Sequence, residues 1–476
     1  MGDPLTPLSA EESEMIQWLQ DNQDHDQILA DLKENLQTAI EIELATIPIY
    51  LFTYYSLIRN QYSGEHIRAI DLYANKAGGM IMSVAVEEML HLSLSSNILY
   101  ALGEDPKLYK KSPSPYPTSL PYHNPVGPSG PDGSTQVLIP LSKFSYEQLW
   151  HFLQIEYPAA KGAWPEDRNW DTIGQFYSYI RCQICCLEDE DFQYRGADAQ
   201  KNQIQPYNYS PNNIDTVYPK SKFDPWAVPS ASGETSASAV AVYTNQSDSH
   251  VGPTALQTIT SKREALEAIA TICDQGEGYA HQATDDPSKS EDSHYFKFLT
   301  LQAQLQQYEN RVEQLPTAPT PPDPITPTFT EEDLAPSHDP VVVDFPDNPT
   351  TARYAGDSDA QAWSNLCNGV YQYMLILVET IFKVPDPNQK LFFNQAMHYS
   401  MIWVLDKLIQ AMRDTTISAG PHKDKILAPT FENYDLGERK DAYANLIALT
   451  QATDTIETNW GPTIKALPDV SAYWES

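Results

Sequence analysis

The sequence predicts a mainly α-helical protein, and three observations support this fold class. Apolar residues recur at three- and four-residue steps through several long stretches, which is the period of a helix that buries one face. Turn residues and helix stops separate these stretches, and few segments have the alternating pattern of a strand. Hydrophobic residues make up 41% of the 476 residues, enough to bury a large core. We therefore expect a helical bundle with long irregular insertions and an additional helical hairpin near the C-terminus.

The first long helix is expected from about Asp26 to Ile58. The apolar residues that share one of its faces are Leu32, Leu36, Ile40, Ile47, Tyr50 and Tyr54. Glu43 lies on the same face, where a carboxylate is costly unless it is paired or bound to metal. Pro48 removes a backbone hydrogen bond one turn further on and should distort the helix there. A distorted helix next to a buried carboxylate indicates a functional site.

The second long helix is expected from about Glu65 to Leu102, because Gly103 is a typical helix stop. It contains Glu88 and His91, which are three residues apart and so lie one turn apart on the same face. A carboxylate and an imidazole on one inward-facing helix form half of a di-iron or di-manganese carboxylate site.

Further helices are expected beyond this pair. Ser145 is a suitable N-cap for a helix from Tyr146 to Glu156 that Pro158 would end. Additional helices are predicted over 171–187 and 261–283. Residues 195–253 form a long polar insertion, and insertions of this kind often cover sites in enzymes.

The chain divides into three parts on this basis. Residues 26–315 are expected to form a metal-binding bundle, and the Pro-rich residues 316–350 a strap on its surface. Residues 351–476 are expected to add C-terminal helices that pack on the bundle. Their predicted ranges are 359–383, 388–413 and 440–459.

A di-metal carboxylate site needs about four carboxylates and two imidazoles from four helices. Glu43, Glu88 and His91 supply one half of such a set. The sequence alone leaves several candidates open for the other half, and these are Glu156, Glu277, His281 and His294.

Charge and cysteine content limit the partners and the compartment. The formal net charge is -34, from 30 basic and 64 acidic residues, so we expect neither nucleic acid nor an anionic membrane as a partner. The five cysteines are an odd number, and the chain has no recognisable signal peptide. Both observations favour a reducing compartment, the cytoplasm.

Several stretches resemble, in the same order, the ferritin-like domain of the iminophenylpyruvate dimer synthases of the violacein and rebeccamycin pathways and their stand-alone relatives. The stretches are Ala39–Leu51 (AIEIELATIPIYL), Glu87–Leu92 (EEMLHL), Phe152–Pro158 (FLQIEYP), Ile173–Tyr177 (IGQFY), Gln275–Gly278 (QGEG) and Ser293–Phe298 (SHYFKF). They extend over about Leu32 to Leu301, and the ordered set is far more specific than any single motif.

The resemblance implies a ferritin-like metal centre with two ions, of iron or manganese. The ligands that it implies are Glu43, Glu88, His91, Glu156, Glu277 and His294. It favours His294 over His281 as the second imidazole. This chain differs from its relatives at Gln175, where they tend to have Glu, and at Tyr157, where they tend to have Arg. If the glutamate that relatives have at position 175 is a ligand, the site of this chain is one carboxylate short.

The leading functional hypothesis is an oxidoreductase or oxygenase of secondary metabolism. It would use dioxygen or a peroxide to oxidise a small organic substrate, and the resemblance suggests an aromatic, amino-acid-derived one. Tyr50, Tyr54 and Tyr295 lie near the proposed ligands in sequence and are the candidates to line the substrate pocket or to carry an oxidising equivalent. The alternatives are a non-catalytic metal-binding protein and a ferritin-like scaffold without metal.

Overall fold

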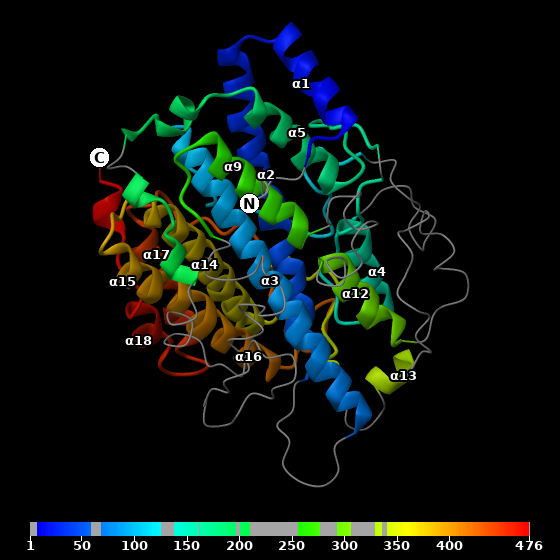
Figure 1. Cartoon of the computed structure of the whole chain (residues 1–476). Helices are drawn as coiled ribbons and strands as arrows, with labels where there is room; N and C mark the ends of the chain where they lie inside the picture. The colour runs from blue at the N-terminus through cyan, green and yellow to red at the C-terminus, as the bar shows by residue number, and fades with distance from the viewer. Residues whose placement is uncertain are drawn as a thin grey trace.

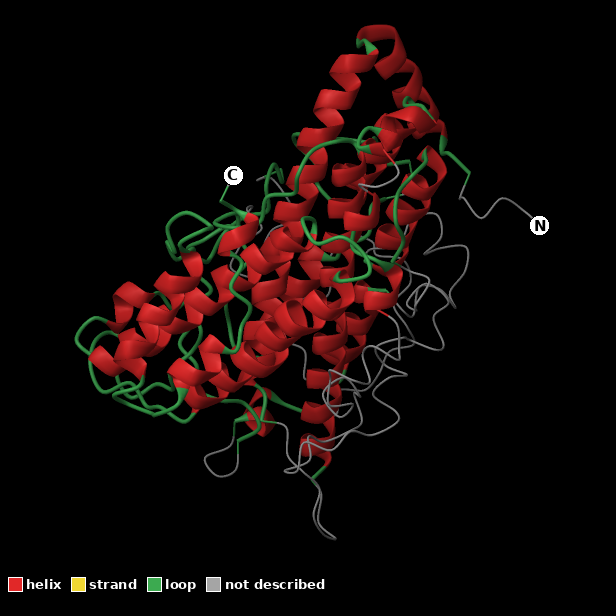
Figure 2. Ribbon diagram, turned by 90° about the vertical axis from the view of Figure 1, so that its left-hand side faces the viewer, coloured by secondary structure: helices red, strands yellow, loops and turns green. Residues whose placement is uncertain are grey.

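The computed structural model describes residues 7–58, 68–124, 138–160, 162–196, 200–209, 256–276, 293–305, 329–335 and 340–475. Helices dominate these ranges (Figure 1; Figure 2). The β structure within them consists of isolated bridges, such as the one between Leu57 and Val342. The mainly α-helical fold predicted from the sequence is confirmed. None of the helices in the described ranges combines the length and the hydropathy needed to cross a bilayer.

Two long helices and two pairs of shorter helices form the central bundle. The long helices are α2 (His25–Ser56) and α3 (Ala69–Ala101). The pairs are α4 (Tyr146–Ile155) with α5 (Ile173–Cys185), and α9 (Lys262–Gln275) with α12 (His294–Ala303). Helix α2 packs along α3, and α9 contacts both α3 and α5, while α4 packs against α12. The third and fourth arms of the bundle are therefore each made of two helices.

Hydrogen bonds at the ends of the helices define the direction of the chain. Phe144, just before α4, donates its backbone N–H to Ser56 Oγ at the end of α2, over 2.8 Å. Lys262, at the start of α9, donates to the carbonyl of Leu187 just after α5, over 2.7 Å. The segment between α3 and α4 therefore crosses from one end of the bundle to the other. One such long crossover is a known variation of the four-helix bundle.

The central helices begin where the sequence provides caps. Asp24 accepts the N–H of Gln27 at the start of α2, and Ser145 accepts the N–H of Gln148 at the start of α4. Helix α2 continues through Pro48, and side chains reach the backbone of the preceding turn. Tyr116, for example, donates its hydroxyl to the carbonyl of Ala45 over 3.1 Å.

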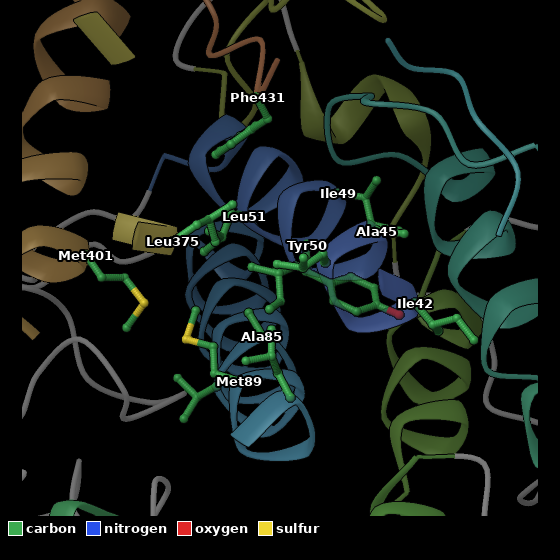
Figure 3. Packing of buried hydrophobic residues seen from close by; sticks show 14 of the residues in the cluster. Ile42, Ala45, Ile49, Tyr50, Leu51, Ala85, Met89, Leu375, Met401 and Phe431 are labelled. Carbon is green, nitrogen blue, oxygen red and sulfur yellow. The ribbon is translucent and has the colours of Figure 1, made fainter. Parts of the chain in front are cut away.

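The second half of α2 is buried all round, from Ile42 to Ser56, because it is covered on two sides. The bundle packs on one side and the C-terminal helices pack on the other. In Figure 3, Leu375 and Met401 lie on one side of α2, while the ring of Tyr50 points to the other. The central position of α2 explains why its sequence is apolar beyond a single stripe.

The C-terminal helices pack on the bundle. Their bounds are α14 (Ser358–Ile381), α15 (Gln389–Phe393), the π-helix η7 (Asn394–Leu405), α16 (Asp406–Arg413), α17 (Ala442–Thr453) and α18 (Trp460–Lys465). Helix α14 and the stretch from α15 to α16 form the predicted hairpin. Glu379 on α14 accepts the backbone N–H groups of Leu108 and Tyr109 over 2.7 and 2.9 Å, which ties the hairpin to the crossover.

An N-terminal helix, α1 (Ala10–Asn22), packs against α5. Short helical turns complete the described secondary structure. They are η1 (Asp189–Gln193), η2 (Gln200–Asn202), η3 (Pro206–Tyr209), α13 (Glu331–Leu334), η6 (Thr351–Tyr354) and η8 (Ser471–Tyr473).

Two segments that the sequence predicts to cover the bundle are described in part. In the insertion, Ile204 donates its N–H to Asn97 Oδ1 on α3 over 2.8 Å. In the strap, Val343 donates its N–H to the carbonyl of Ser56 over 2.7 Å. Residues 210–253 and 316–328 lie outside the described residues.

Candidate metal centre

Five of the predicted ligands converge in the middle of the bundle. Glu43 comes from α2, and Glu88 and His91 come from α3. Glu156 ends α4 and His294 begins α12, so both lie where an arm of the bundle is interrupted. All five residues are at most 4% exposed.

The five residues form two groups that share one carboxylate. The donor atoms of Glu43, Glu88 and His91 all lie within 4.8 Å of one another, and so do those of Glu88, Glu156 and His294. Glu88 belongs to both groups, which is the position of a bridging ligand in a two-metal site.

Both imidazoles direct Nδ1 at carboxylates. His294 Nδ1 lies 2.9 Å from Glu88 Oε1 and 3.5 Å from Glu156 Oε2. His91 Nδ1 lies 3.9 Å from Glu43 Oε2. The two rings are nearly parallel, with centroids 5.5 Å apart and an interplanar angle of 25°.

The other nitrogen of each imidazole is held by a neighbouring side chain. His91 Nε2 lies 2.9 Å from Gln275 Oε1, and His294 Nε2 lies 2.9 Å from Glu87 Oε2. Lys297, one turn further along α12, donates to both oxygens of Glu87 over 2.7 and 2.9 Å. Histidines that bind metals are usually oriented in this way, by a partner on the nitrogen that faces away from the ion.

Each carboxylate also accepts a hydrogen bond from a hydroxyl. Tyr177 donates to Glu43 Oε1 over 2.7 Å, and Thr46 donates to Glu88 Oε2 over 2.9 Å. Tyr50 donates to Glu156 Oε1. These bonds leave each carboxylate an oxygen that faces the cluster.

Burial and mutual repulsion set the protonation of the metal-free cluster. Burial, with the charge of Glu88, raises the pKa of Glu43 well above its ordinary value. Burial opposes ionisation of Glu88 too, but its hydrogen bond with Glu43 and the imidazole of His294 lower its pKa. Burial lowers the pKa of His91 to about 4, whereas the surrounding carboxylates outweigh burial and raise the pKa of His294. The cluster therefore holds protons that a cation would displace.

Four of the five ligands, Glu43, Glu88, His91 and Glu156, line one side of a cavity of about 80 Å³. Its other walls are mostly small or apolar, and they include Ile42, Ala159, Ala160, Ala163, Ile173, Ile272 and Cys273. Ser9 and Glu12 from α1 also line it, so the N-terminal helix contributes to its boundary. These walls offer apolar contact to a small molecule that lies beside the cluster.

Gln175 lines the same cavity but acts as a helix cap. Its Oε1 accepts the N–H groups of Asp171 and Thr172 over 3.1 and 3.2 Å, and its Nε2 donates to the carbonyl of Trp164 over 3.0 Å. A glutamate at position 175 could accept the same two N–H groups. The residue at this position therefore has a structural role as a helix cap whether or not a metal is bound. Tyr157 is the other position at which this chain differs from the relatives that it resembles. The centroid of its ring lies 5.8 Å from that of Tyr295.

The three tyrosines proposed from the sequence lie in different surroundings. Tyr50 contacts the cluster through Glu156. Tyr295 is buried with its ring against Tyr157 and Phe296. Tyr54 lines a second cavity, because it is eleven residues beyond Glu43 on α2 and so about 16 Å further along the helix axis. Tyr54 therefore lies outside the carboxylate cluster and its cavity.

Glu277 and His281 lie outside the described residues. The described neighbour of Glu277 is Gly276, which lines the cavity and accepts the N–H of His294 over 3.1 Å. Helix α12 thus resumes where α9 stops. Glu277 stays a prediction, and the structure places His294 in the cluster.

The side chains that support the ligands were not identified as site residues from the sequence. They are Thr46, Glu87, Tyr177, Gln275 and Lys297. Glu87 and Lys297 could have been found from the sequence, because Glu87 is next to Glu88 and Lys297 lies one helical turn after His294. Tyr177 and Gln275 lie within motifs that carry the resemblance, but nothing in their spacing assigns them a role.

The donor set fits a pair of divalent ions of the iron or manganese type. Carboxylate oxygens and imidazole nitrogens are the ligands that such ions take in helical bundles. Within the described residues, the buried Nδ1 of His294 makes no hydrogen bond, although it lies between two carboxylates. With carboxylate oxygens on both sides of it, this nitrogen is placed to bind a metal ion together with them.

A family model described as Ferritin-like matches residues 36–303, which contain all five converging ligands. Among solved structures, a ferritin-like protein from Caulobacter vibrioides is similar at 19% identity with a TM-score of 0.40, over 78% of this chain and 93% of that chain. No curated protein matches the chain.

Proposed function

Because this chain belongs to the ferritin-like family, whose model covers more than half of it, we propose that it is a metal-dependent oxidoreductase acting on a small organic substrate. The observation that carries this proposal is the pair of ligand groups that share Glu88. A chain that only needed a stable core would not bury three carboxylates together, since burial opposes the ionisation of each.

Glu43, Glu88 and His91 would hold one ion, and Glu88, Glu156 and His294 the other. Glu277 stays a proposed sixth ligand. When bound, two ions of iron or manganese would supply the redox steps with dioxygen or a peroxide.

The side chains of the protein would orient the ligands and the substrate. Gln275 and Glu87 fix the two imidazoles so that Nδ1 faces the carboxylates. Tyr50 holds one oxygen of Glu156, and its phenol keeps its proton because burial raises its pKa. The apolar cavity beside the cluster favours a substrate that presents an uncharged face to the ligands.

The substrate class rests on the sequence motifs. Their similarity to those of the iminophenylpyruvate dimer synthases supports an aromatic, amino-acid-derived substrate in secondary metabolism.

The cysteines are free in the structure, which suits a reducing compartment such as the cytoplasm.

Metal content and dioxygen uptake test the proposal together. We expect protein purified without added metal to contain close to two ions of iron or manganese per chain by elemental analysis. Dioxygen consumption should rise on addition of an aromatic amine or imino acid. The variant Glu88→Gln should lose both properties, and Glu267→Gln, on the surface beside Arg263, should retain them. Wild-type protein that binds no metal under any condition would contradict the proposal.

A non-catalytic role is the second candidate, and one observation favours it. The carboxylates already accept hydrogen bonds from Tyr177, Thr46 and Tyr50, so the cluster is stabilised without metal. Metal at two ions per chain without dioxygen uptake would identify a metal-binding protein. A complete absence of metal would identify a scaffold.

A further inference from the structure

A second polar cavity lies between α16 and the end of α2. Asp406, Gln410 and Arg413 occupy positions i, i+4 and i+7 of α16 and therefore share one face. The opposite face carries Leu408, which is buried in the core. In sequence this polar face looks like a solvated surface, but in the structure it lines a cavity together with Tyr54.

The volume of this cavity is about 420 Å³, which is within the range of small-ligand pockets. It is lined by Tyr54, Tyr55, Leu57, Ile58, Val343, Asp406, Gln410, Arg413 and Asp414. Tyr54, Tyr55 and Asp406 are buried and form its floor, whereas Gln410 and Asp414 are exposed at its rim. The cavity is therefore open to solvent at one side and closed at the other.

Arg413 has no direct partner in the part of the chain that the structure describes, where it makes neither a hydrogen bond nor an ion pair. Burial lowers its pKa, and the nearest opposing charges, Asp406 and Asp414, act on it only across space. Asp406 accepts a hydrogen bond from Gln410 over 2.9 Å. A guanidinium that is partly removed from water and unpaired is unfavourable, so a ligand with a matching group would stabilise it.

The charges in the cavity indicate what kind of ligand fits. The planar guanidinium of Arg413 suits a carboxylate, to which it can donate two parallel hydrogen bonds. A simple anion would be repelled by the two aspartates, and a simple cation would leave Arg413 without a carboxylate to bind. A molecule that carries both a carboxylate and an ammonium group satisfies both sets. Leu57, Ile58 and Val343 offer apolar contact for the rest of it.

We propose that this cavity binds a free α-amino acid with an apolar side chain, with its carboxylate on Arg413 and its ammonium group facing Asp406 and Asp414. The site is separate from the carboxylate cluster. Tyr50 contacts the cluster, whereas Tyr54, one helical turn beyond, lines the amino-acid cavity.

Titration calorimetry with three ligands that share a phenylethyl skeleton tests the charge requirement. The ligands are L-phenylalanine, 3-phenylpropionate without the ammonium group, and 2-phenylethylamine without the carboxylate. We expect L-phenylalanine to bind, and each analogue to bind about tenfold more weakly or worse because one charge-assisted contact is lost. Equal binding of an analogue, or no binding of any amino acid at millimolar concentration, would overturn the proposal.

Variants locate the site. Arg413→Gln and Asp414→Asn should each weaken L-phenylalanine binding about tenfold. Since Asp414 is exposed, its variant keeps the test valid if Arg413→Gln does not fold. Lys407→Gln, on the exposed face of the same helix, removes one positive charge and should leave binding unchanged. Glu88→Gln should also leave binding unchanged, which separates this site from the metal centre. Loss of binding in Glu88→Gln but not in Arg413→Gln would refute the assignment.

Discussion

Replacement of Glu88 by alanine should remove the response of protein stability to metal. In the metal-free protein, the loss is mainly the hydrogen bond between Glu88 and Glu43, because His294 keeps Glu87 and Glu156 as neighbours and Thr46 keeps the carbonyl of Glu43 as an acceptor. We expect a cost of about 1 kcal/mol, the usual value for one buried hydrogen bond. In the metal-loaded protein, the same change removes the carboxylate that both ligand groups share.

The metal-linked gain follows from mass action. A ligand that binds only the native state, at a free concentration of 100 times its Kd, adds about 2.7 kcal/mol to the free energy of unfolding. The family match covers residues 36–303, and for a domain of that size 1 kcal/mol changes Tm by about 2 °C. Wild-type protein should therefore melt about 5 °C higher with Fe(II) or Mn(II) than with a chelator. The Glu88→Ala variant should show almost none of this difference.

Glu12→Ala is the matched control, because Glu12 is as deeply buried as Glu88 but pairs with an arginine. Arg181 Nη1 donates to both oxygens of Glu12 over 2.9 and 3.0 Å. Removal of Glu12 takes both of these charge-assisted hydrogen bonds from a buried guanidinium and should cost about 3–5 kcal/mol with or without metal. Calorimetric melting curves of the three proteins, each with chelator and with metal, give the comparison. The reasoning is refuted if Glu88→Ala behaves like Glu12→Ala, or if metal raises the Tm of both variants equally.

Two further substitutions test individual contacts. Tyr177→Phe removes the hydroxyl that orients Glu43 and should lower metal affinity about tenfold, measured by competition with a chelating dye; unchanged affinity would show that this bond does not matter. Asp357→Ala removes the N-cap of α14 and should cost about 1–2 kcal/mol at neutral pH, measured by urea unfolding. Burial opposes the ionisation of Asp357, but hydrogen bonds from Ala360 and Ser418 outweigh burial and lower its pKa. The contribution of Asp357 to stability is therefore full above about pH 4 and is lost as pH falls through the folded-state pKa. The difference between wild type and Asp357→Ala should therefore shrink below pH 4, and a constant difference would contradict this.

The helices of the bundle could be predicted from the sequence because their caps and periodicity agree. The predicted helix 26–58 is observed as His25–Ser56, and the predicted helix 65–102 as Ala69–Ala101. Ser145 caps α4 as expected. The cavity beside α16 was not predicted, because the polar face of that helix has the same sequence pattern as a solvated surface.

The ligands were easier to predict than their supports. Glu43 and the Glu88/His91 pair stand out because charged groups on apolar helices are rare. Tyr54 has the same spacing as Tyr50, but helical periodicity fixes a direction and not a depth along the axis. The contact between Tyr177 and Glu43 joins residues 134 positions apart, and no local pattern reports such a contact.

Anomalous scattering from a crystal of the iron- or manganese-loaded protein tests the central claim most directly. The account predicts two peaks in the bundle core, one among Glu43, Glu88 and His91, and the other among Glu88, Glu156 and His294, with Glu88 contacting both. The same map would show whether Glu277 is a ligand. Metal peaks only at surface carboxylates, with none beside Glu88, would contradict the account.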